Sequence, residues 1–544
     1  MSSSLLRIDN LSIHFGPTEN PLMAVDRASF DLRRGETVVL VGESGSGKSI
    51  LALSIMRLLP HAARIIGGTI TLEDTDILAL PESRMRTIRG ARVGMIFQEP
   101  QSSLNPVITI GKQIGEVLRR HKGLRGRAQA MRIIELLTAV GIPDPQERYA
   151  EFPHQFSGGM KQRVMIAIAI AAEPDLLIAD EPTTALDVTV QAQVLRLLKE
   201  QQRKHDMGIL FITHDLGVAY QMADRVVVMK DGAIVETGSR SDFYRAPRHA
   251  YSKQLFAALP SREKRIREGI DLTITNHDPV LEIRDLKVYY PIRRGLLKRI
   301  VGYVKAVDGV TLTLNRGTTV AIVGESGSGK TTMGKGILRL LPLAGGQVIY
   351  AGQDLATLNP SQMRACRSNL QVVFQDPYSS MNPRMMVNDI IQEGMIAQGI
   401  GADRNARETR VDELLVQVGL EPSHKYRYPH EFSGGQRQRI CIARALAVEP
   451  QVIICDEPTS ALDVSVQAQI LQLFRDLQRE LGLTYLFITH NLSVVAYMAH
   501  YVAVMYRGEI VEQGPIDDIL DAPQHPYTRE LLAAIPLIGG PRIT

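Results

Sequence analysis

The stretch Gly42-Glu43-Ser44-Gly45-Ser46-Gly47-Lys48-Ser49 decides the fold, and it returns as Gly324-Glu325-Ser326-Gly327-Ser328-Gly329-Lys330-Thr331. Both copies follow an apolar run that we predict to be a buried strand, Thr37–Val41 or Thr319–Val323. Both open a segment that we predict to be a helix, Ser49–Leu59 or Thr331–Leu341. A strand, a glycine-rich loop and a helix in this order form a phosphate-binding loop, because backbone N–H groups and the helix N-terminus surround phosphate oxygens. Two copies predict two bound nucleotides per chain.

The last two residues of each loop suit a nucleotide that binds together with a metal ion. Lys48 and Lys330 supply a positive charge to the β- and γ-phosphates. The hydroxyl groups of Ser49 and Thr331 are oxygen ligands of the kind that Mg²⁺ takes beside phosphates. We therefore expect Mg²⁺ as a cofactor in both copies.

The motifs after the loop also repeat, in the same order and at nearly the same spacing, so the chain consists of two homologous halves. We predict a first domain at residues 1–260, a linker at 261–279 and a second domain at 280–544. The linker is polar and carries a basic run, which we interpret as solvated: Arg262, Lys264, Arg265 and Arg267.

Bulk composition excludes several classes of protein. The chain has 544 residues, of which 44% are hydrophobic and 22% charged, as in ordinary globular proteins. Its net charge of +4 is too small to indicate a nucleic-acid partner. The longest strongly apolar stretch, Val164–Ala172, is far short of the roughly 20 residues that span a bilayer. The N-terminus has no secretory signal, and the three cysteines lack zinc or disulfide spacing, so we expect a cytosolic chain.

Further strands alternate with helical segments in each half, which predicts a largely parallel α/β sheet covered by helices. A long segment with helical periodicity lies between the glycine loop and the next buried strand, and we interpret it as an inserted helical subdomain. That next strand, Leu176–Ala179 or Val452–Cys455, ends in an Asp-Glu pair.

We predict that Asp180 and Asp456 hold Mg²⁺, and that Glu181 and Glu457 act as general bases on the attacking water. Such a pair alone is more often a helix N-terminal cap. The repeated context Glu-Pro-Thr favours the catalytic interpretation.

Ser157-Gly158-Gly159-Met160 and Ser433-Gly434-Gly435-Gln436 resemble the signature motif of the ABC-type ATPases, and the resemblance covers both halves almost end to end. It implies two tandem P-loop ATPase domains, each with a mostly parallel sheet, an antiparallel β subdomain and a helical subdomain. It also implies ATP as the nucleotide.

The same resemblance assigns several roles. Gln98 and Gln375 match the glutamine loop that reaches nucleotide and metal, Asp187 and Asp463 match the D-loop, and His214 and His490 match the switch histidine. Phe15 and Tyr290 match the aromatic residue that stacks on adenine, with a core position as the alternative.

In this family two domains close head to tail, so the resemblance implies that the loop at Lys48 shares ATP with Ser433 and the loop at Lys330 with Ser157. Met160 and Lys161 stand where the second half has Gln436 and Arg437, a departure from the family pattern. We still expect hydrolysis at both composite sites.

Two further repeats point to a task. Pro247-Arg248-His249-Ala250-Tyr251 and Pro523-Gln524-His525-Pro526-Tyr527 resemble the C-terminal motif of ATPases that serve peptide and nickel importers, although a packing role is the simpler local explanation. The fused form is most similar to Yej-type oligopeptide and microcin C importers, and next to glutathione importers. This implies two permease subunits, a substrate-binding protein and a peripheral position at the cytoplasmic face of the inner membrane.

Two details remain open. The basic loop with Arg293, Arg294, Lys298 and Arg299 is either a solvated turn or a contact with a lipid surface. The alternative function is a soluble twin-cassette ATPase acting on the ribosome, but the linker is short and lacks helical periodicity. The resemblance to peptide-importer ATPases implies that an iron–sulfur cluster, where one occurs, is held by cysteines of the C-terminal extension. No cysteine follows Cys455, so we expect no such cluster.

Overall fold

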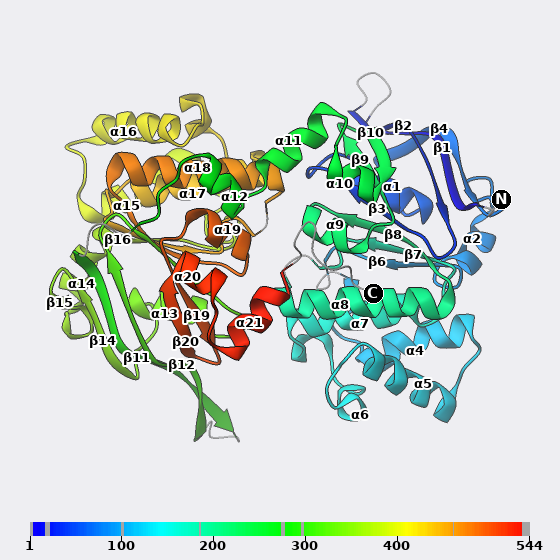
Figure 1. Ribbon diagram of the computed structural model, residues 1–544, viewed down its shortest axis with the longest axis horizontal. Coiled ribbons are helices and arrows are strands. Elements are labelled where there is room, and N and C mark those ends of the chain that lie inside the picture. The colour runs from blue at the N-terminus through cyan, green and yellow to red at the C-terminus, as the bar shows by residue number, and fades with distance from the viewer. Residues whose placement is uncertain are drawn as a thin grey trace. The chain divides into compact units, whose positions relative to one another are not determined.

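The computed structural model of the protein describes residues 4–16, 22–99, 103–183, 186–273, 278–294, 299–460 and 462–535. Tertiary contacts divide these residues into unit 1, within Met1–Ala257, and unit 2, within Ala258–Ile535. Figure 1 shows the elements of both units. Each unit is described by itself.

Unit 1 contains two sheets. The antiparallel sheet has the order β2-β1-β4-β5, with β1 Ser4–Phe15, β2 Leu22–Arg33, β4 Ala63–Leu72 and β5 Thr75–Asp76. The larger sheet has the order β10-β9-β3-β8-β7-β6, with β3 Thr37–Val41, β6 Val93–Ile96, β7 Leu176–Asp180, β8 Gly208–Thr213, β9 Arg225–Lys230 and β10 Ala233–Ser239. All pairs in the larger sheet are parallel except that of β9 with β10.

The helices of unit 1 fall into two groups. One group accompanies the sheets: α1 Lys48–Ile55, α2 Glu82–Ile88, α8 Val188–His205, α9 Leu216–Met222, α10 Arg240–Arg245 and α11 Ala250–Ala258. The other is the predicted helical insertion: α4 Ile110–His121, α5 Gly126–Ala139, α6 Pro145–Arg148 and α7 Gly158–Ile170. In the insertion α4 and α5 pack on each other and on α7, which also contacts β6 (Figure 1).

Unit 2 repeats this architecture. Its antiparallel sheet has the order β12-β11-β14-β15, with β11 Pro279–Arg294, β12 Arg299–Asn315, β14 Gly345–Tyr350 and β15 Gln353–Asp354. Its larger sheet has the order β16-β17-β18-β13-β19-β20, with β13 Thr319–Val323, β16 Leu370–Val373, β17 Val452–Asp456, β18 Thr484–Ile488, β19 Tyr501–Tyr506 and β20 Glu509–Pro515. Its helices are α12 Arg262–Arg267, α13 Lys330–Ile337, α14 Pro360–Asn369, α15 Val387–Gln398, α16 Arg404–Gln417, α17 Gly434–Leu446, α18 Val464–Leu481, α19 Leu492–Met498, α20 Ile516–Asp521 and α21 Pro526–Ala533.

The strands that carry the site have continuous apolar sequences because helices cover both faces of a parallel sheet. Every residue of β3, β7, β13 and β17 is buried. The observed bounds of β3 and β13 are those that the apolar runs predict. The fold class predicted from the two glycine loops is therefore confirmed.

The helix after each loop is shorter than its apolar pattern predicts. The pattern extends to Leu59, but α1 ends at Ile55. Arg57 takes a left-handed conformation with φ 50°. Its guanidinium donates to the carbonyl oxygens of Ile77 and Leu80, so a tertiary contact ends the helix. Arg339 repeats this conformation at φ 49° after α13.

The basic run before β11 is not simply solvated, and this expectation was wrong. Arg265 of α12 is only 5% exposed and donates both to the carbonyl oxygen of Ala496 and to Asp517, at 2.7 Å from Oδ1. Arg262 forms an ion pair with Asp521. The segment therefore packs onto α19 and α20 of unit 2.

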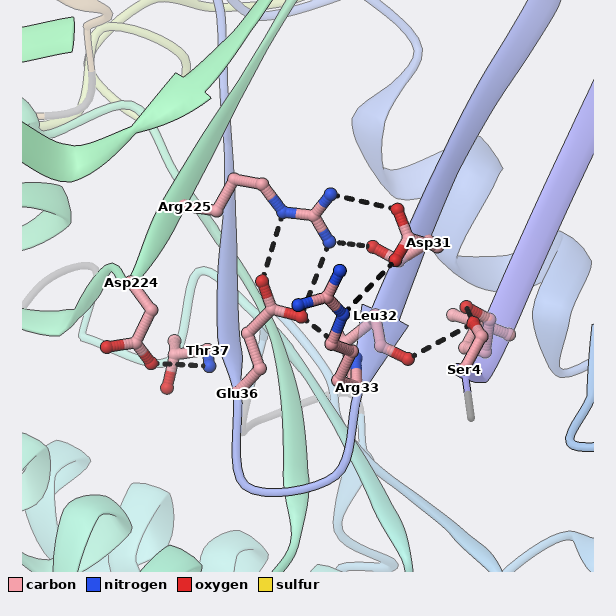
Figure 2. A network of polar contacts seen from close by, with 9 residues as sticks. Ser4, Asp31, Leu32, Arg33, Glu36, Thr37, Asp224 and Arg225 are labelled. Carbon is pink, nitrogen blue, oxygen red and sulfur yellow. Dashed lines mark hydrogen bonds and ion pairs between the residues drawn. The ribbon is translucent and has the colours of Figure 1, made fainter. Parts of the chain in front are cut away.

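A polar network in unit 1 ties the start of β9 to the turn between β2 and β3 (Figure 2). The Arg225 guanidinium donates to Asp31 Oδ1 at 2.9 Å and to Glu36 Oε1 at 3.0 Å. The hydrogen bond from Arg225 lowers the pKa of Asp31. Beside it, Asp224 Oδ2 accepts a hydrogen bond of 2.8 Å from the backbone N–H of Thr37 (Figure 2).

Unit 2 replaces this carboxylate with an imidazole. His500 Nδ1 accepts the hydrogen bond from the backbone N–H of Thr319 at 3.1 Å. Burial lowers the pKa of His500 to about 4, although Asp271 opposes the shift. A protonated Nδ1 would present a donor to another donor, so the fold requires the neutral ring.

We predict that unit 2 loses stability as the pH falls. A histidine whose pKa is depressed by folding contributes stability above its unfolded pKa, near 6.5, and that contribution is lost as the pH falls toward 4. Between pH 7 and pH 5 the loss should be roughly 1 to 2 kcal/mol. Hydrogen exchange of peptides from β13 and β19, compared between pH 7 and pH 5, measures this loss of stability. His500→Asn keeps an acceptor and should remove this pH dependence, whereas His61→Asn, at an exposed position of unit 1, should leave it intact. An equal pH effect in His500→Asn would contradict the assignment.

Candidate functional site

The glycine loop leaves β3 and enters α1 through a left-handed glycine. Gly47 has φ 97°, and a Cβ atom there would lie 2.1 Å from the carbonyl oxygen of Ala24. Gly329 repeats this in unit 2, with φ 106° and 2.0 Å to the carbonyl oxygen of Ala306. Only glycine fits both the conformation and the space.

The loop lysine closes the turn from inside. Lys48 Nζ donates to the carbonyl oxygens of Gly42 at 2.8 Å and Glu43 at 2.6 Å. Lys330 Nζ does the same at Gly324 and Glu325, at 2.8 and 2.7 Å. Both lysines are buried. The arrangement buries an ammonium group within the loop, and a positive charge there suits an anion site.

In each unit a predicted hydroxyl ligand in the first turn of a helix, α1 or α13, meets the aspartate that ends a buried strand, β7 or β17. Ser49 Oγ lies 3.1 Å from Asp180 Oδ1, and Thr331 Oγ1 lies 2.9 Å from Asp456 Oδ1. Burial is the main cause that raises the pKa of Asp180 to about 6, and it also raises the pKa of Asp456. A buried carboxylate that resists ionisation gains most from a cation beside it.

This donor set fits Mg²⁺ rather than a metal held entirely by protein. Within the described ranges there is no group of three or more His, Cys, Asp or Glu that could hold a metal ion. Each unit instead offers one carboxylate and one hydroxyl group. Mg²⁺ usually takes one or two carboxylates and completes its shell with phosphate oxygens and water.

The predicted general base of unit 1 sits on a sharp turn. Glu181 has φ 47°, a left-handed conformation that is uncommon for a residue with a side chain. Its N–H donates to the carbonyl oxygen of Ile212 at 3.0 Å. Gln98 Nε2 lies 3.1 Å from Glu181 Oε2, and His214 Nδ1 lies 3.1 Å from Oε1. Tertiary structure thus brings the predicted glutamine, glutamate and histidine together.

Unit 2 builds the same triad. Glu457 has φ 45°, with Gln375 Nε2 at 2.9 Å from Oε2 and His490 Nδ1 at 3.2 Å from Oε1. Burial raises the pKa of Glu457, but the hydrogen bond and charge of His490 and the charge of Lys330 outweigh it and lower the pKa. In unit 1, burial opposes protonation of His214, and its bond to Glu181 nevertheless raises the histidine pKa. In unit 2 the pair therefore favours an ionised Glu457 carboxylate.

The two signature turns differ in how firmly they are held. Ser433 caps α17 in a closed box, because its Oγ accepts from the N–H of Gln436 and the side chain of Gln436 accepts from the N–H of Ser433 at 3.0 Å. Ser157 caps α7 through its Oγ alone, since Met160 has no side-chain acceptor. Gly158 and Gly159, like Gly434 and Gly435, form the first turns of these helices.

Four further residues that the family resemblance assigned to the nucleotide site, the D-loop aspartates and the two aromatic residues, lie at the ends of helices or in strands of the antiparallel sheets. Asp187 caps α8 and Asp463 caps α18, each accepting a hydrogen bond from a backbone N–H of its helix. Phe15 is half-buried at the end of β1, and Tyr290 is exposed in β11. Contact of these four with nucleotide stays a prediction.

One link was missed by sequence reasoning. Tyr251 Oη accepts a hydrogen bond of 3.0 Å from the backbone N–H of Glu43, and Tyr527 Oη accepts one of 2.9 Å from Glu325. These tyrosines belong to the repeated C-terminal motifs, for which packing was the simpler explanation. Their repetition at matched positions was the available signal. The motif therefore holds the first turn of each glycine loop.

Comparison with known families agrees with this site. The ABC transporter family matches residues 25–184 and 307–460. The C-terminal region of oligopeptide/dipeptide transporters matches residues 235–285 and 511–543. Both matches occur once in each half of the chain.

Two relatives align over nearly the whole chain. The chain is 50% identical over 531 residues to a peptidoglycan transport ATP-binding protein of Agrobacterium fabrum, covering 97% of this chain and 96% of that protein. It is 47% identical over 564 residues to a glutathione import ATP-binding protein of Escherichia coli K12, covering 98% and 90%. A solved ATP-binding cassette with ADP and Pi aligns with 43% of this chain and 98% of its own length, at 28% identity and a TM-score of 0.39.

We predict that the tyrosine hydroxyl groups set nucleotide affinity. Tyr527→Phe leaves the N–H of Glu325 without this acceptor and loosens the loop, which should raise the dissociation constant of a fluorescent ATP analogue about fivefold. The second site is isolated for this titration by Lys48→Ala. Tyr485→Phe is the matched control, because it removes another buried tyrosine hydrogen bond of unit 2, to the carbonyl oxygen of Phe474. Equal affinities in both variants would show that the hydroxyl has no role at the loop.

Proposed function

The chain belongs to the ABC transporter family, and on that premise we propose that it is the energy-coupling subunit of an importer for peptide-like cargo. As a member of this family it binds and hydrolyses ATP. The observation that carries the importer assignment is the oligopeptide/dipeptide C-terminal region, which occurs in both halves. Its tyrosines contact both glycine loops, so the region is attached to the ATP site itself.

The site supports a simple division of roles in each unit. Glu181 and Glu457 accept a proton from the attacking water. The left-handed turn at each glutamate fixes the direction of its carboxylate. His214 and His490 hold these carboxylates from one oxygen, while Gln98 and Gln375 hold them from the other. Positioning of this kind is the main contribution a protein makes to phosphoryl transfer.

The residues that we propose as metal and phosphate ligands lie beside these glutamates in each unit. Asp180 with Ser49, and Asp456 with Thr331, would hold Mg²⁺, which when bound neutralises charge on the phosphate oxygens. The amide nitrogens of Gln98 and Gln375 bond the glutamates, so their amide oxygens would reach the metal. Lys48 and Lys330 would exchange carbonyl contacts for the β- and γ-phosphates.

We further propose that ATP is shared head to tail, as the family resemblance implies. Ser433 would complete the site of Lys48, and Ser157 that of Lys330. Each signature turn presents N–H groups at a helix N-terminus, where they would bond the γ-phosphate. Covalent linkage makes this closure intramolecular and raises its effective concentration. ATP binding would drive closure and hydrolysis would release it.

Motion of this kind requires partners that carry the cargo. No helix in the described part of the chain is long and apolar enough to cross a bilayer. We therefore propose two membrane permease subunits, a substrate-binding protein outside the membrane, and a peripheral position at the cytoplasmic face. The named cargoes of the two relatives, peptidoglycan and glutathione, both contain short peptides. A ribosome-directed ATPase would have no use for the oligopeptide/dipeptide region.

We predict that both sites hydrolyse ATP. Glu181→Gln or Glu457→Gln alone should lower ATP turnover at least by half, and the double variant should lower it about 100-fold or more, the usual contribution of a general base. Released phosphate measures the rates. Glu449→Gln is the matched control, since Glu449 also has a left-handed backbone, at φ 54°, but lies outside the site. Unchanged turnover in either single variant would refute hydrolysis at that site.

The importer assignment is tested with the complete transporter in lipid vesicles. We expect its ATP turnover to rise when the binding protein is supplied with di- to octapeptides or glutathione, and to stay at its basal rate with Ni²⁺. Stimulation by Ni²⁺ alone, or by none of these, would refute peptide-like cargo and leave the ATPase assignment intact. Sedimentation of the purified chain with ribosomes would favour the alternative function.

A further inference from the structure

The antiparallel sheet of unit 2 has an extension that is not found among the described residues of unit 1. Phe15 pairs with Leu22 in unit 1, and at the matching position Tyr290 pairs with Val304 in unit 2. In unit 1 the strands β1 and β2 stop at this pair. In unit 2, β11 continues to Arg294 and β12 already begins at Arg299. The result is a two-stranded ribbon that projects from the other strands of its sheet (Figure 1).

The ribbon exposes apolar side chains on both faces. Ile300, Val301, Tyr303 and Val304 are 51%, 59%, 56% and 53% exposed. Tyr303 and Val304 follow one another in regular pairing with Pro291 and Tyr290, so they point to opposite faces of the ribbon. Val301 is an extra residue between Ile300 and Gly302, where the register of the two strands shifts. An isolated two-stranded ribbon is marginally stable in water, and a cluster of exposed apolar residues on it marks a contact surface.

The charge of this segment has one sign. Residues 286–307 contain six lysines and arginines and no aspartate or glutamate. Lys287 and Lys305, at the base, form ion pairs with Asp285 and Asp308. Arg293 and Arg299, on the ribbon, form no ion pair with any residue that the structure describes. The ribbon therefore combines unneutralised guanidinium groups with exposed aliphatic side chains and a tyrosine.

We propose that this ribbon binds the anionic surface of a phospholipid bilayer. Its guanidinium groups would pair with lipid phosphates, since the planar fork of arginine matches phosphate oxygens. Ile300, Val301 and Tyr303 would enter the boundary between headgroups and acyl chains, where tyrosine and aliphatic groups on a basic segment are stabilised. Charge pairing and apolar insertion each add little to the binding free energy alone, and the ribbon supplies both on adjacent residues.

A nucleic acid fits this surface less well. Binding of single strands relies on aromatic platforms for bases, whereas the exposed apolar residues here are mostly aliphatic. Lipid binding by the purified chain does not require permease subunits, so its absence would leave the importer assignment intact.

Vesicle binding of the purified full-length chain tests the charged part. The chain should float with vesicles of equal parts phosphatidylglycerol and phosphatidylcholine, and not with phosphatidylcholine alone. The double substitution Arg293→Gln and Arg299→Gln should weaken binding about 30-fold, from the usual contribution of two basic residues near an anionic surface. The matched control, Arg404→Gln with Arg479→Gln, removes two guanidinium groups of unit 2 that are 80% and 75% exposed. It should weaken binding less than threefold.

A single fluorophore tests the apolar part, because the chain has no tryptophan. Tyr303→Trp should shift its emission to the blue with anionic vesicles and be quenched by brominated acyl chains. Tyr426→Trp, at another exposed tyrosine of unit 2, should show neither change. Unchanged thermal unfolding confirms that the variants fold.

Three outcomes would overturn the proposal: no flotation of the wild-type chain, flotation that the Arg293 and Arg299 substitutions leave unchanged, or Tyr303→Trp emission that ignores the vesicles. Protection of Tyr303→Trp only in a complex with permease subunits would assign the ribbon to a protein interface. Tighter binding to single-stranded RNA than to anionic vesicles, lost in the same double variant, would assign it to a nucleic acid.

Discussion

The site depends on closure of the glycine loop around a lysine whose ammonium group is held by backbone carbonyl oxygens. Lys48 Nζ bonds the carbonyl oxygens of Gly42 and Glu43, and this is possible only because Gly47 turns the chain where a Cβ would meet the carbonyl oxygen of Ala24. Loop, helix N-terminus and charge are thereby set before a nucleotide binds. Preorganisation of this kind avoids the free-energy cost of ordering the loop at each turnover.

Parallel strand order then assembles the remaining groups. Gln98 follows β6, Glu181 follows β7 and His214 follows β8, and these three strands are neighbours in one sheet. Since the carboxyl ends of parallel strands share one edge, side chains far apart in sequence converge there. The left-handed turn at Glu181, held by the carbonyl oxygen of Ile212, adds local strain that keeps the carboxylate between glutamine and histidine.

The two units conserve this centre and differ around it. Glu181 and Glu457 have φ of 47° and 45°, and their partners lie at similar distances. Outside the site, His500 accepts the hydrogen bond from Thr319 that corresponds to the bond from Thr37 to Asp224, and among the described residues the extended ribbon belongs to unit 2. Ser433 has a closed capping box that Ser157 lacks. The geometry of the candidate site is thus duplicated, whereas the helix cap, the acceptor at the start of the central strand and the exposed ribbon differ between the units.

Sequence alone determined the loops, the buried strands and the choice of candidate site residues, because each of these rests on a local pattern. The bounds of β3 and β13 follow from apolar runs of a few residues. The aspartates that end β7 and β17 are located in the same way, because each directly follows an apolar run. Only tertiary structure decided that Gln98 would bond Glu181, that Tyr251 would support the glycine loop, that Arg57 would end α1, and that Arg265 would be buried. These contacts join residues from separate elements, and their formation depends on strand order and packing, which local spacing does not encode.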